Sequence, residues 1–123
     1  MYVHFWGTRG SLPVSVTAEA VRGKIRRALL ESRKHSLRTD RDVEAFLEGL
    51  PFSVRGTYGG NTPCVEIGGG VETVLCDAGT GIRDFGNAFL KSGRGSGDHP
   101  AVFHLFITHL HWDHIQGFPF FVP

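Results

Sequence analysis

The chain has 123 residues, a length that fits one domain or part of one. Apolar residues make up 41% of it and charged residues 20%, which is typical of a globular protein and excludes a disordered chain. The formal net charge of +1 gives no overall field that favours nucleic acid or an anionic membrane. No apolar run approaches the ~20 residues of a membrane span, and the N-terminus lacks the pattern of a secretory signal. We therefore expect a cytoplasmic protein.

The chain begins with the pattern of a strand followed by a helix. Residues 2–8 are rich in β-branched and aromatic side chains, which predicts a strand, and the segment 9–13 ends it as a loop. A helix is predicted from about 17 to 35, with Thr17 as its N-cap. Its apolar residues recur at helical spacing and are Val21, Ile25, Ala28 and Leu29.

A second, shorter helix is predicted from about 41 to 49. Either Asp40 or Thr39 caps its start, and Pro51 ends it. The polar, glycine-bearing segment 53–62 then predicts a loop.

The second half of the chain predicts three strands and one helix. In chain order these are strands at 64–67 and 71–77, a helix at about 82–91, a loop of small residues at 92–100, and a strand at 102–108. The glycine triplet at 68–70 joins the first two strands, which is a good signal for a β-hairpin.

Cys64 and Cys76 are the only cysteines. Two cysteines cannot form a disulfide framework, and a cytosolic chain would keep them reduced. Because they lie at the two ends of the predicted hairpin, we interpret them as small core residues. The alternative, that they bind zinc, is disfavoured because the close spacing of paired zinc cysteines is absent.

The first predicted helix is locally basic. Between 17 and 38 only Glu19 and Glu31 are acidic, and seven residues are basic: Arg22, Lys24, Arg26, Arg27, Arg33, Lys34 and Arg38. The simpler interpretation is the solvated face of an amphipathic helix. The alternative is an electrostatic lure or lid for an anionic substrate.

Four ligand-type side chains lie within six residues directly after the last predicted strand: His109, His111, Asp113 and His114. The two histidines two positions apart would point to the same side of an extended strand. Three imidazoles and a carboxylate suit Zn²⁺, Mn²⁺ or Fe²⁺. The sequence therefore predicts a metal site. We interpret the other histidines as surface or structural residues: His4, His35, His99 and His104.

This motif, His-x-His-x-Asp-His after an apolar strand, resembles that of the metallo-β-lactamase-fold hydrolases. The surrounding sequence resembles the phosphodiesterase-like branch, which includes the phosphoribosyl cyclic phosphate phosphodiesterases and relatives of the long-form tRNA 3′-processing nucleases. The matching pieces are Gly7-Thr8-Arg9-Gly10-Ser11, Tyr58-Gly59-Gly60-Asn61-Thr62, Leu75-Cys76-Asp77-Ala78-Gly79 and the segment from Thr108 to Gly117. They cover roughly two-thirds of the chain, and the segment 17–50 reads as a helical insertion.

The resemblance implies a role for each residue of the motif. His109 and His111 would ligate the first metal ion, and Asp113 and His114 the second. Two divalent ions, most readily zinc with manganese or iron as alternatives, would activate a bridging hydroxide against a small phosphodiester. Asp113 is the implied catalytic residue, because it would also accept a hydrogen bond from that hydroxide.

Other matching residues have two interpretations. Asp77 would orient a metal ligand through a hydrogen bond, or it simply forms the turn after its strand. Asn61 and Thr62 would line the edge of the site, or they form a simple turn. Arg9 would add to phosphate binding, although nothing in the sequence fixes this role.

The ligand set is incomplete, because each ion would have two protein ligands where catalytic zinc typically has three and a water. The resemblance calls for a further histidine, a bridging acidic residue and a last histidine, all beyond residue 123. It also implies an α/β fold, the N-terminal half of a four-layer αβ/βα sandwich whose C-terminal half is absent. We expect little or no turnover from the 123 residues alone.

Three explanations fit this deficit. The chain would be a fragment of a longer enzyme, one half of a split protein, or a self-associating chain. The apolar segment 118–123 favours the first explanation. For function, two alternatives to a phosphodiesterase stay open. One is another hydrolase of the same fold, acting as a nuclease or on thioesters or lactams, and the other is an incomplete metal-binding or interaction module.

Overall fold

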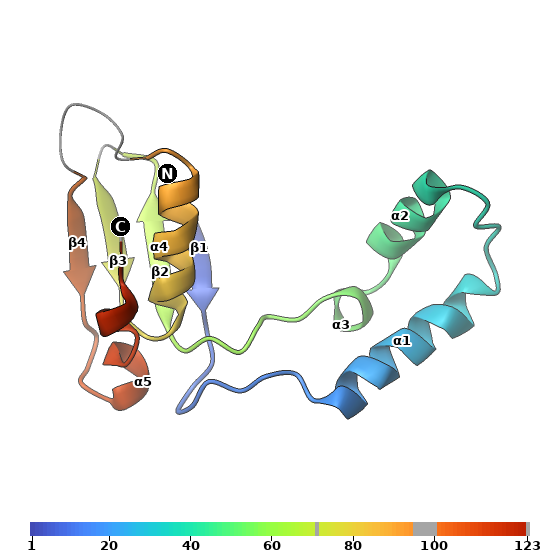
Figure 1. Ribbon diagram of the computed structural model, residues 1–123, viewed down its shortest axis with the longest axis horizontal. Coiled ribbons are helices and arrows are strands. Elements are labelled where there is room, and N and C mark those ends of the chain that lie inside the picture. The colour runs from blue at the N-terminus through green and yellow to red at the C-terminus, as the bar shows by residue number, and fades with distance from the viewer. Residues whose placement is uncertain (71, 95–100, 123) are drawn as a thin grey trace. The chain divides into compact units, whose positions relative to one another are not determined.

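A computed structural model of the chain describes residues 1–70, 72–94 and 101–122. It divides into two compact units, a sheet unit of Met1–Val14 and Gly59–Pro123 and a helical unit of Ser15–Tyr58 (Figure 1). The described residues form a four-stranded sheet and five α-helices, so the predicted α/β class is confirmed. Parts of two predicted elements, Val71 of a strand and 95–100 of a loop, lie outside the described residues.

The sheet unit is built on four strands in the order β1-β2-β3-β4. They are β1 (Tyr2–Gly7), β2 (Cys64–Gly68), β3 (Thr73–Cys76) and β4 (Phe103–Phe106). β2 pairs antiparallel with both β1 and β3, so the predicted hairpin is confirmed. β3 and β4 are parallel, and both therefore end at the same edge of the sheet.

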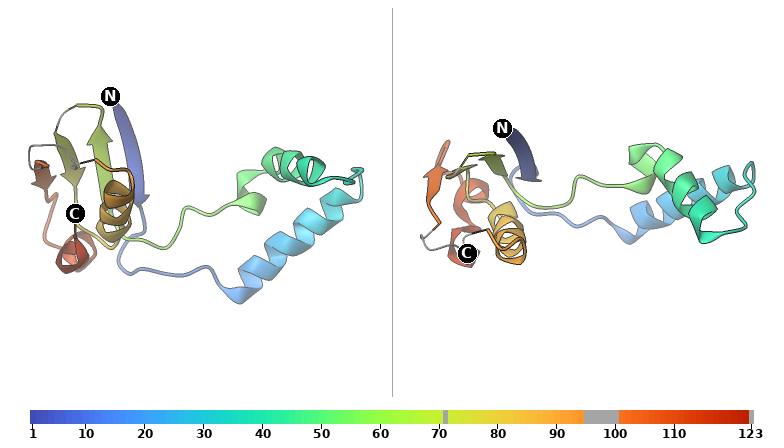
Figure 2. Two further views of the ribbon diagram at one scale, coloured as in Figure 1. Left: turned by 45° about the horizontal axis from the view of Figure 1, so that its top comes forward. Right: turned by 90° about the horizontal axis from the view of Figure 1, so that it is seen from above.

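One face of the sheet is covered by α4 (Gly81–Lys91), as Figures 1 and 2 show. The hydrophobic core lies between them, with Cys64, Leu75, Ala78, Ile82, Phe85 and Phe89 as its buried residues. The fully buried ring of Phe85 packs at 5.9–6.0 Å, centroid to centroid, against aromatic rings of β1, α4, β4 and the segment after α5. Burying one such side chain contributes about 2–3 kcal/mol to stability.

The opposite face of the sheet is apolar and exposed. Val3 and Phe5 of β1 are 52% and 64% exposed, and Phe106 of β4 is 59% exposed. Along β1 they alternate with side chains on the covered face, as the period of two of a strand requires. Within the described residues of the sheet unit, no helix covers this face (Figure 2).

The helical unit contains α1 (Ala18–Ser32), α2 (Asp40–Gly49) and α3 (Phe52–Arg55). Thr17 caps α1 by accepting a hydrogen bond from the backbone N–H of Ala20. Thr39, one of the two expected caps of α2, forms a capping box with Asp42. Both predicted helices are thus confirmed, although α1 ends three residues earlier than expected.

The prediction of a loop from residue 53 is wrong for its first three residues, because α3 lies there. Pro51 explains the difference, since its fixed φ ends one helix and suits the start of the next. The backbone N–H groups of Val54 and Arg55 both donate to the carbonyl of Pro51. Lys24 of α1 then donates to the carbonyls of Ser53 and Gly56 at 2.6 Å each, and so joins α1 to α3.

None of the helices among the described residues combines the length and the apolar character needed to cross a membrane. Ser92 caps α4 at its C-terminus, where its backbone N–H donates to carbonyls of the last turn.

A buried carboxylate lies beneath the sheet's covered face. Glu66 of β2 is 1% exposed and accepts hydrogen bonds from Tyr2 Oη at 2.7 Å, Trp6 Nε1 at 2.9 Å and Arg94 Nη1 at 2.7 Å. Burial raises the pKa of Glu66, but the hydrogen bonds that it accepts, led by that of Arg94, outweigh burial and hold its pKa below the ordinary 4.5. These bonds connect β1, β2 and the segment after α4.

The pKa of Glu66 predicts a dependence of stability on pH. Because the pKa is lower in the folded protein, this stabilisation is present above about pH 4.5 and is lost as the pH falls through the pKa of the folded state. Glu66→Gln should therefore lower the unfolding free energy at pH 7 and make its decline below pH 4.5 shallower. Tyr2→Phe, which removes one donor, should have a smaller effect. Urea unfolding followed by tryptophan fluorescence tests this, since Trp6 and Trp112 both lie in the sheet unit. An unchanged decline in Glu66→Gln would contradict it.

The loops at the edge of the sheet pack backbone against backbone. α5 (Trp112–Ile115) and the residues after it pack on the turn after β3. The Ala78 N–H donates to the His114 carbonyl, and the Gly117 N–H donates to the Ala78 carbonyl. A Cβ on Gly117 would lie 2.0 Å from the Gly79 carbonyl oxygen, and a Cβ on Gly79 would lie 2.4 Å from that of Asp113. Glycine is required at both positions because no side-chain atom fits.

Gly117→Ala should lower the unfolding free energy of the sheet unit by about 3 kcal/mol, since the added Cβ forces two backbone segments apart. Gly86→Ala in α4 is the matched control. Its Cβ would meet nothing closer than 3.6 Å, and alanine favours a helix. Tryptophan-monitored urea unfolding of both variants makes the comparison, and equal stability of the two would show that the close approach is not needed.

Candidate metal centre

The predicted metal ligands lie at the edge of the sheet where β3 and β4 end. Asp77 follows β3 directly, and its backbone N–H donates to the Phe106 carbonyl at 2.8 Å. Thr108 to His111 follow β4, and α5 begins at Trp112. The carboxyl ends of neighbouring parallel strands are a favoured place for binding sites, because the side chains that follow them converge.

The three imidazole rings of the motif lie together. The ring centroid of His109 is 4.5 Å from that of His111 and 4.0 Å from that of His114. The strand predicted at 102–108 is shorter in the structure, because β4 ends at Phe106, and His109 and His111 lie in the connection to α5. The parallel pairing ends there because Asp77, the residue after β3, adopts a left-handed conformation with a φ of 66° and leaves the direction of the strand.

Asp113 lies in the first turn of α5 and is 8% exposed. Its Oδ2 accepts a hydrogen bond of 2.9 Å from the backbone N–H of Ser11, a residue whose own φ is 64°. This hydrogen bond, followed by the nearby imidazoles, holds the pKa of Asp113 below its ordinary 3.8. The carboxylate is therefore ionised at neutral pH, as a metal ligand must be.

Asp113 and His114 present their donor atoms side by side. His114 Nε2 lies 3.5 Å from Asp113 Oδ2. Two atoms that bind one tetrahedral zinc ion at ~2.0–2.1 Å lie roughly 3.3 Å apart. The spacing of this pair therefore suits two ligands of one ion, which is the pairing that the resemblance implies.

Asp77 combines the two roles that the sequence left open. It forms the turn after β3 in the left-handed conformation, which aspartate tolerates better than most residues. Its carboxylate also accepts hydrogen bonds from the backbone N–H of Thr108 at 2.8 Å and from His114 Nδ1 at 2.8 Å. Burial raises the pKa of Asp77, but the hydrogen bonds from Thr108 and His114 outweigh burial and lower it.

Asn61 and Thr62 are held by structural hydrogen bonds. The Asn61 side chain donates to Asp84 at 2.6 Å and accepts from the Thr80 hydroxyl at 3.1 Å. Thr62 is fully buried, and its hydroxyl oxygen accepts from the Thr80 backbone N–H at 2.8 Å and from Gln116 at 3.2 Å. These bonds tie the loop before β2 to the start of α4 and to the end of α5.

The imidazoles and the carboxylate of the motif are side chains that bind divalent metal ions. Within residues 1–70, 72–94 and 101–122, no three His, Cys, Asp or Glu side chains are arranged so that they could hold one ion. His114 Nδ1 is hydrogen-bonded to Asp77, so its Nε2 is the nitrogen left for a metal. The four residues of the motif thus lie close together, but no three of them converge on one point.

The cysteines and the other histidines are structural where they are described. Cys64 is fully buried in the core, and burial raises the pKa of its thiol to about 12, so it stays protonated. Cys76 is half-buried, and both cysteines are free. His4 stacks on Trp6, His35 packs against Phe46 and His104 pairs with Glu72, whereas His99 lies outside the described residues.

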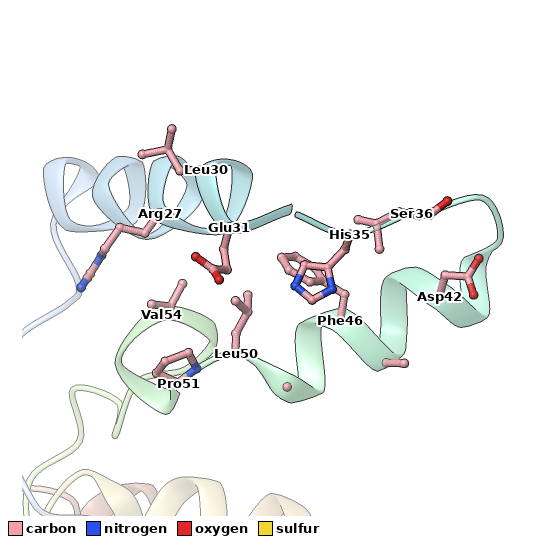
Figure 3. Close-up of a pocket in the computed structure, with 13 residues that line it drawn as sticks. Arg27, Leu30, Glu31, His35, Ser36, Asp42, Phe46, Leu50, Pro51 and Val54 are labelled. Carbon is pink, nitrogen blue, oxygen red and sulfur yellow. The ribbon is translucent and has the colours of Figure 1, made fainter. Parts of the chain in front are cut away.

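A second candidate site is a cavity of about 800 Å³ within the helical unit (Figure 3). Apolar side chains of the three helices line it, and Figure 3 shows Glu31 of α1 pointing toward Leu50 and His35 lying beside the Phe46 ring. Glu31 pairs with Lys34 at 2.9 Å, and Asp42 is used in the capping box of α2. The polar groups of this cavity are thus mixed in charge and give no single ligand chemistry.

Two residues of the metal centre had no assigned role in the sequence. Ser11 contributes its backbone N–H to Asp113, which no side-chain pattern reveals. The Thr108 hydroxyl lies 2.9 Å from Asp77 Oδ1 and 3.1 Å from His109 Nδ1. The sequence did contain a signal for Thr108. Its hydroxyl lies directly before His109, where it can form a hydrogen bond to a metal ligand or to the partner of one.

Comparisons with protein-family models, curated proteins and solved structures find no match to this chain. The resemblance to metallo-β-lactamase-fold hydrolases therefore stays a prediction from the motif. The functional interpretation depends on the residues at the edge of the sheet and on their geometry.

The hydrogen bonds of Asp77 predict the effect of removing its charge. Asp77→Asn keeps a residue that tolerates the left-handed turn but weakens the bonds to Thr108 and His114. The unfolding free energy should fall by about 1–3 kcal/mol, and the Thr108 amide hydrogen should exchange faster with solvent. Urea unfolding and hydrogen exchange by NMR measure the two effects.

The matched control is Asp84→Asn, at an exposed carboxylate whose replacement still accepts a hydrogen bond from Asn61. It should change the unfolding free energy by less than about 0.5 kcal/mol. If Asp77→Asn is as stable as this control and Thr108 exchange is unchanged, Asp77 does not organise the site.

Proposed function

We propose that the chain is part of a binuclear metal-dependent hydrolase whose substrate is a phosphodiester, acting in the cytoplasm. The observation that carries the proposal is the gathering of three imidazoles and one ionised carboxylate at the shared end of two parallel strands. Imidazole nitrogens and an ionised carboxylate gathered in this way are the donor set that zinc, manganese or iron prefers.

The ligands divide into two pairs. His109 and His111 would hold one ion, and Asp113 and His114 the other, with zinc favoured by the imidazole-rich set and manganese or iron as alternatives. Two such ions, when bound, supply Lewis acidity toward the phosphodiester oxygens and lower the pKa of water.

The chain's own residues have distinct tasks around this centre. Asp113, ionised and held at Oδ2 by the Ser11 N–H, is positioned to accept a hydrogen bond from an attacking water at its remaining oxygen. Asp77 orients His114 through the 2.8 Å contact to its Nδ1. Arg9 precedes Ser11 by two residues on the same loop and adds a positive charge that would attract a phosphate.

The proposal calls for further metal ligands beyond the four residues of the motif. Each ion would have two of these four, whereas catalytic zinc typically has three protein ligands and a water. The exposed apolar face of β1 and β4 supports the same proposal, since a sheet stabilises its apolar face by packing against another layer. We propose that the layer that covers this face also supplies the missing ligands, from the same polypeptide or from a second chain.

Two other functions stay possible for the same centre. Another hydrolase reaction, on nucleic acid, a thioester or a lactam, would use the same ions. A metal-binding or interaction module without turnover is favoured by one observation, that no three described donors converge on one point.

The proposal predicts the behaviour of the 123-residue chain and of a longer form. The chain alone should bind Zn²⁺ weakly and hydrolyse bis(p-nitrophenyl) phosphate slowly or not at all. His111→Ala should weaken Zn²⁺ binding at least about tenfold, because it removes one of two ligands of an ion. His104→Ala, at an exposed histidine paired with Glu72, is the matched control and should bind Zn²⁺ as the wild type does. Isothermal titration and metal analysis measure binding.

A form that carries the further His and Asp ligands should bind two ions per chain and cleave the phosphodiester. If that form binds two ions and cleaves no phosphodiester, the substrate class is wrong. Rapid turnover by a monomer of the 123-residue chain would show that its four ligands suffice and would overturn the argument for an incomplete site.

A further inference from the structure

The Thr108 hydroxyl lies at the centre of the ligand cluster. Its Oγ1 is 2.9 Å and 3.0 Å from the two oxygens of Asp77, 3.1 Å from His109 Nδ1 and 3.3 Å from His114 Nδ1. One hydroxyl thus touches a buried carboxylate and two of the three imidazoles. The end of the parallel pair places it there, because Cys76 lies opposite Phe106 and the Asp77 N–H donates to the Phe106 carbonyl, which brings the Asp77 carboxylate to the residues that follow β4.

A count of hydrogens decides the direction of these hydrogen bonds. A hydroxyl has one hydrogen, and an ionised carboxylate can only accept. If Thr108 gave its hydrogen to His109, its oxygen would face both Asp77 oxygens within 3.0 Å without a hydrogen between them. The hydroxyl hydrogen therefore goes to Asp77, and the Thr108 oxygen is left as an acceptor.

An acceptor at Thr108 requires a donor on His109. The atom that faces it is Nδ1, so His109 carries its hydrogen there and leaves the Nε2 lone pair free. His114 also carries its hydrogen on Nδ1, because this nitrogen lies 2.8 Å from Asp77 Oδ2 and donates to it without an intervening hydroxyl. His111 differs, because among the described residues its ring contacts His109 and forms no hydrogen bond.

We propose that Thr108 is a positioning residue that passes the orienting effect of Asp77 to His109, so that one buried carboxylate sets Nε2 as the metal-facing nitrogen of both His109 and His114. The metal-facing part of this inference rests on the proposed function, whereas the tautomers are a property of the metal-free protein. The backbone N–H of Thr108 already anchors Asp77 at 2.8 Å, so the hydroxyl is not needed to attach this residue to the turn.

The tautomers are measured in the metal-free chain by long-range ¹H–¹⁵N NMR at pH 8.5, above the ordinary imidazole pKa of about 6.5. In the wild type, His109 and His114 should both carry hydrogen on Nδ1. Thr108→Val keeps the shape and the backbone N–H but removes the hydroxyl, and should shift His109 toward the Nε2-protonated form. His114 should be unchanged in the same sample. Thr108→Ser restores the hydroxyl and should restore the wild-type pattern at His109.

Two results would overturn the inference. One is the finding that His109 of the wild-type protein carries its hydrogen on Nε2. This measurement needs no variant, so it tests the inference even if Thr108→Val does not fold. The other is a folded Thr108→Val in which His109 keeps its hydrogen on Nδ1, which would leave Thr108 a purely structural role.

Titration with Zn²⁺ alone separates this inference from the proposed function. Thr108→Val should weaken Zn²⁺ binding about tenfold, the usual effect of removing a partner of a ligand, and Thr108→Ser should not. Absence of Zn²⁺ binding in every form, with the tautomers as expected, would overturn the proposed metal centre and leave the positioning of His109 established. Equal Zn²⁺ affinity of Thr108→Val and the wild type would overturn the metal-facing part of the inference.

Discussion

The parallel pairing of β3 with β4 is the constraint on which the candidate metal centre depends. It brings the residue after β3 and the residues after β4 to one edge, where the Asp77 N–H still bonds to the carbonyl of Phe106. The left-handed turn at Asp77 then stops the pairing and aims its carboxylate at the chain that follows β4. Thr108 and His114 are held by that carboxylate, so the arrangement of the ligands follows from one strand pair and one turn.

The close packing of glycines makes this arrangement rigid. Gly79 and Gly117 let the turn after β3 and the end of α5 approach to backbone contact. Asp113 lies between them in sequence. Its carbonyl oxygen lies against Gly79, and its carboxylate accepts a hydrogen bond from the Ser11 N–H. A site whose ligands are attached to backbone in this way loses little freedom when a metal binds, which is the advantage of a preorganised centre.

Much of this structure could be predicted from local sequence. The hairpin followed from the glycine triplet at 68–70, and both long helices followed from apolar spacing and from threonine caps at Thr17 and Thr39. The short α3 was missed because Pro51 was interpreted only as the end of a helix, although it suits the start of one equally well. The individual helices and strands thus came from short-range patterns, whereas the α/β class came from the resemblance that the site motif carries.

The geometry of the site could not be predicted in this way. The roles of Ser11 and Thr108 depend on a backbone N–H and on a hydroxyl that meet partners far along the chain, at Asp113 and Asp77. The end of β4 at Phe106 depends on the turn at Asp77 after the neighbouring strand, so the strand predicted to reach Thr108 ends two residues earlier. Tertiary contacts of this kind leave no periodic signal in the sequence.

The position of the helical unit in the chain has an energetic consequence for the sheet. Ser15–Tyr58 leaves the sheet after β1 and returns before β2, and these two strands are hydrogen-bonded neighbours. The two ends are also clamped, since Thr8 and Arg9 donate to Asn61 and Val14 donates to Gly60. The helical unit therefore connects β1 and β2 as a long loop would. The entropic cost of closing a loop grows only with the logarithm of its length, by about 0.6 kcal/mol for each doubling. The chain can thus carry an insertion of many sizes at this point while the strand register beneath it stays the same.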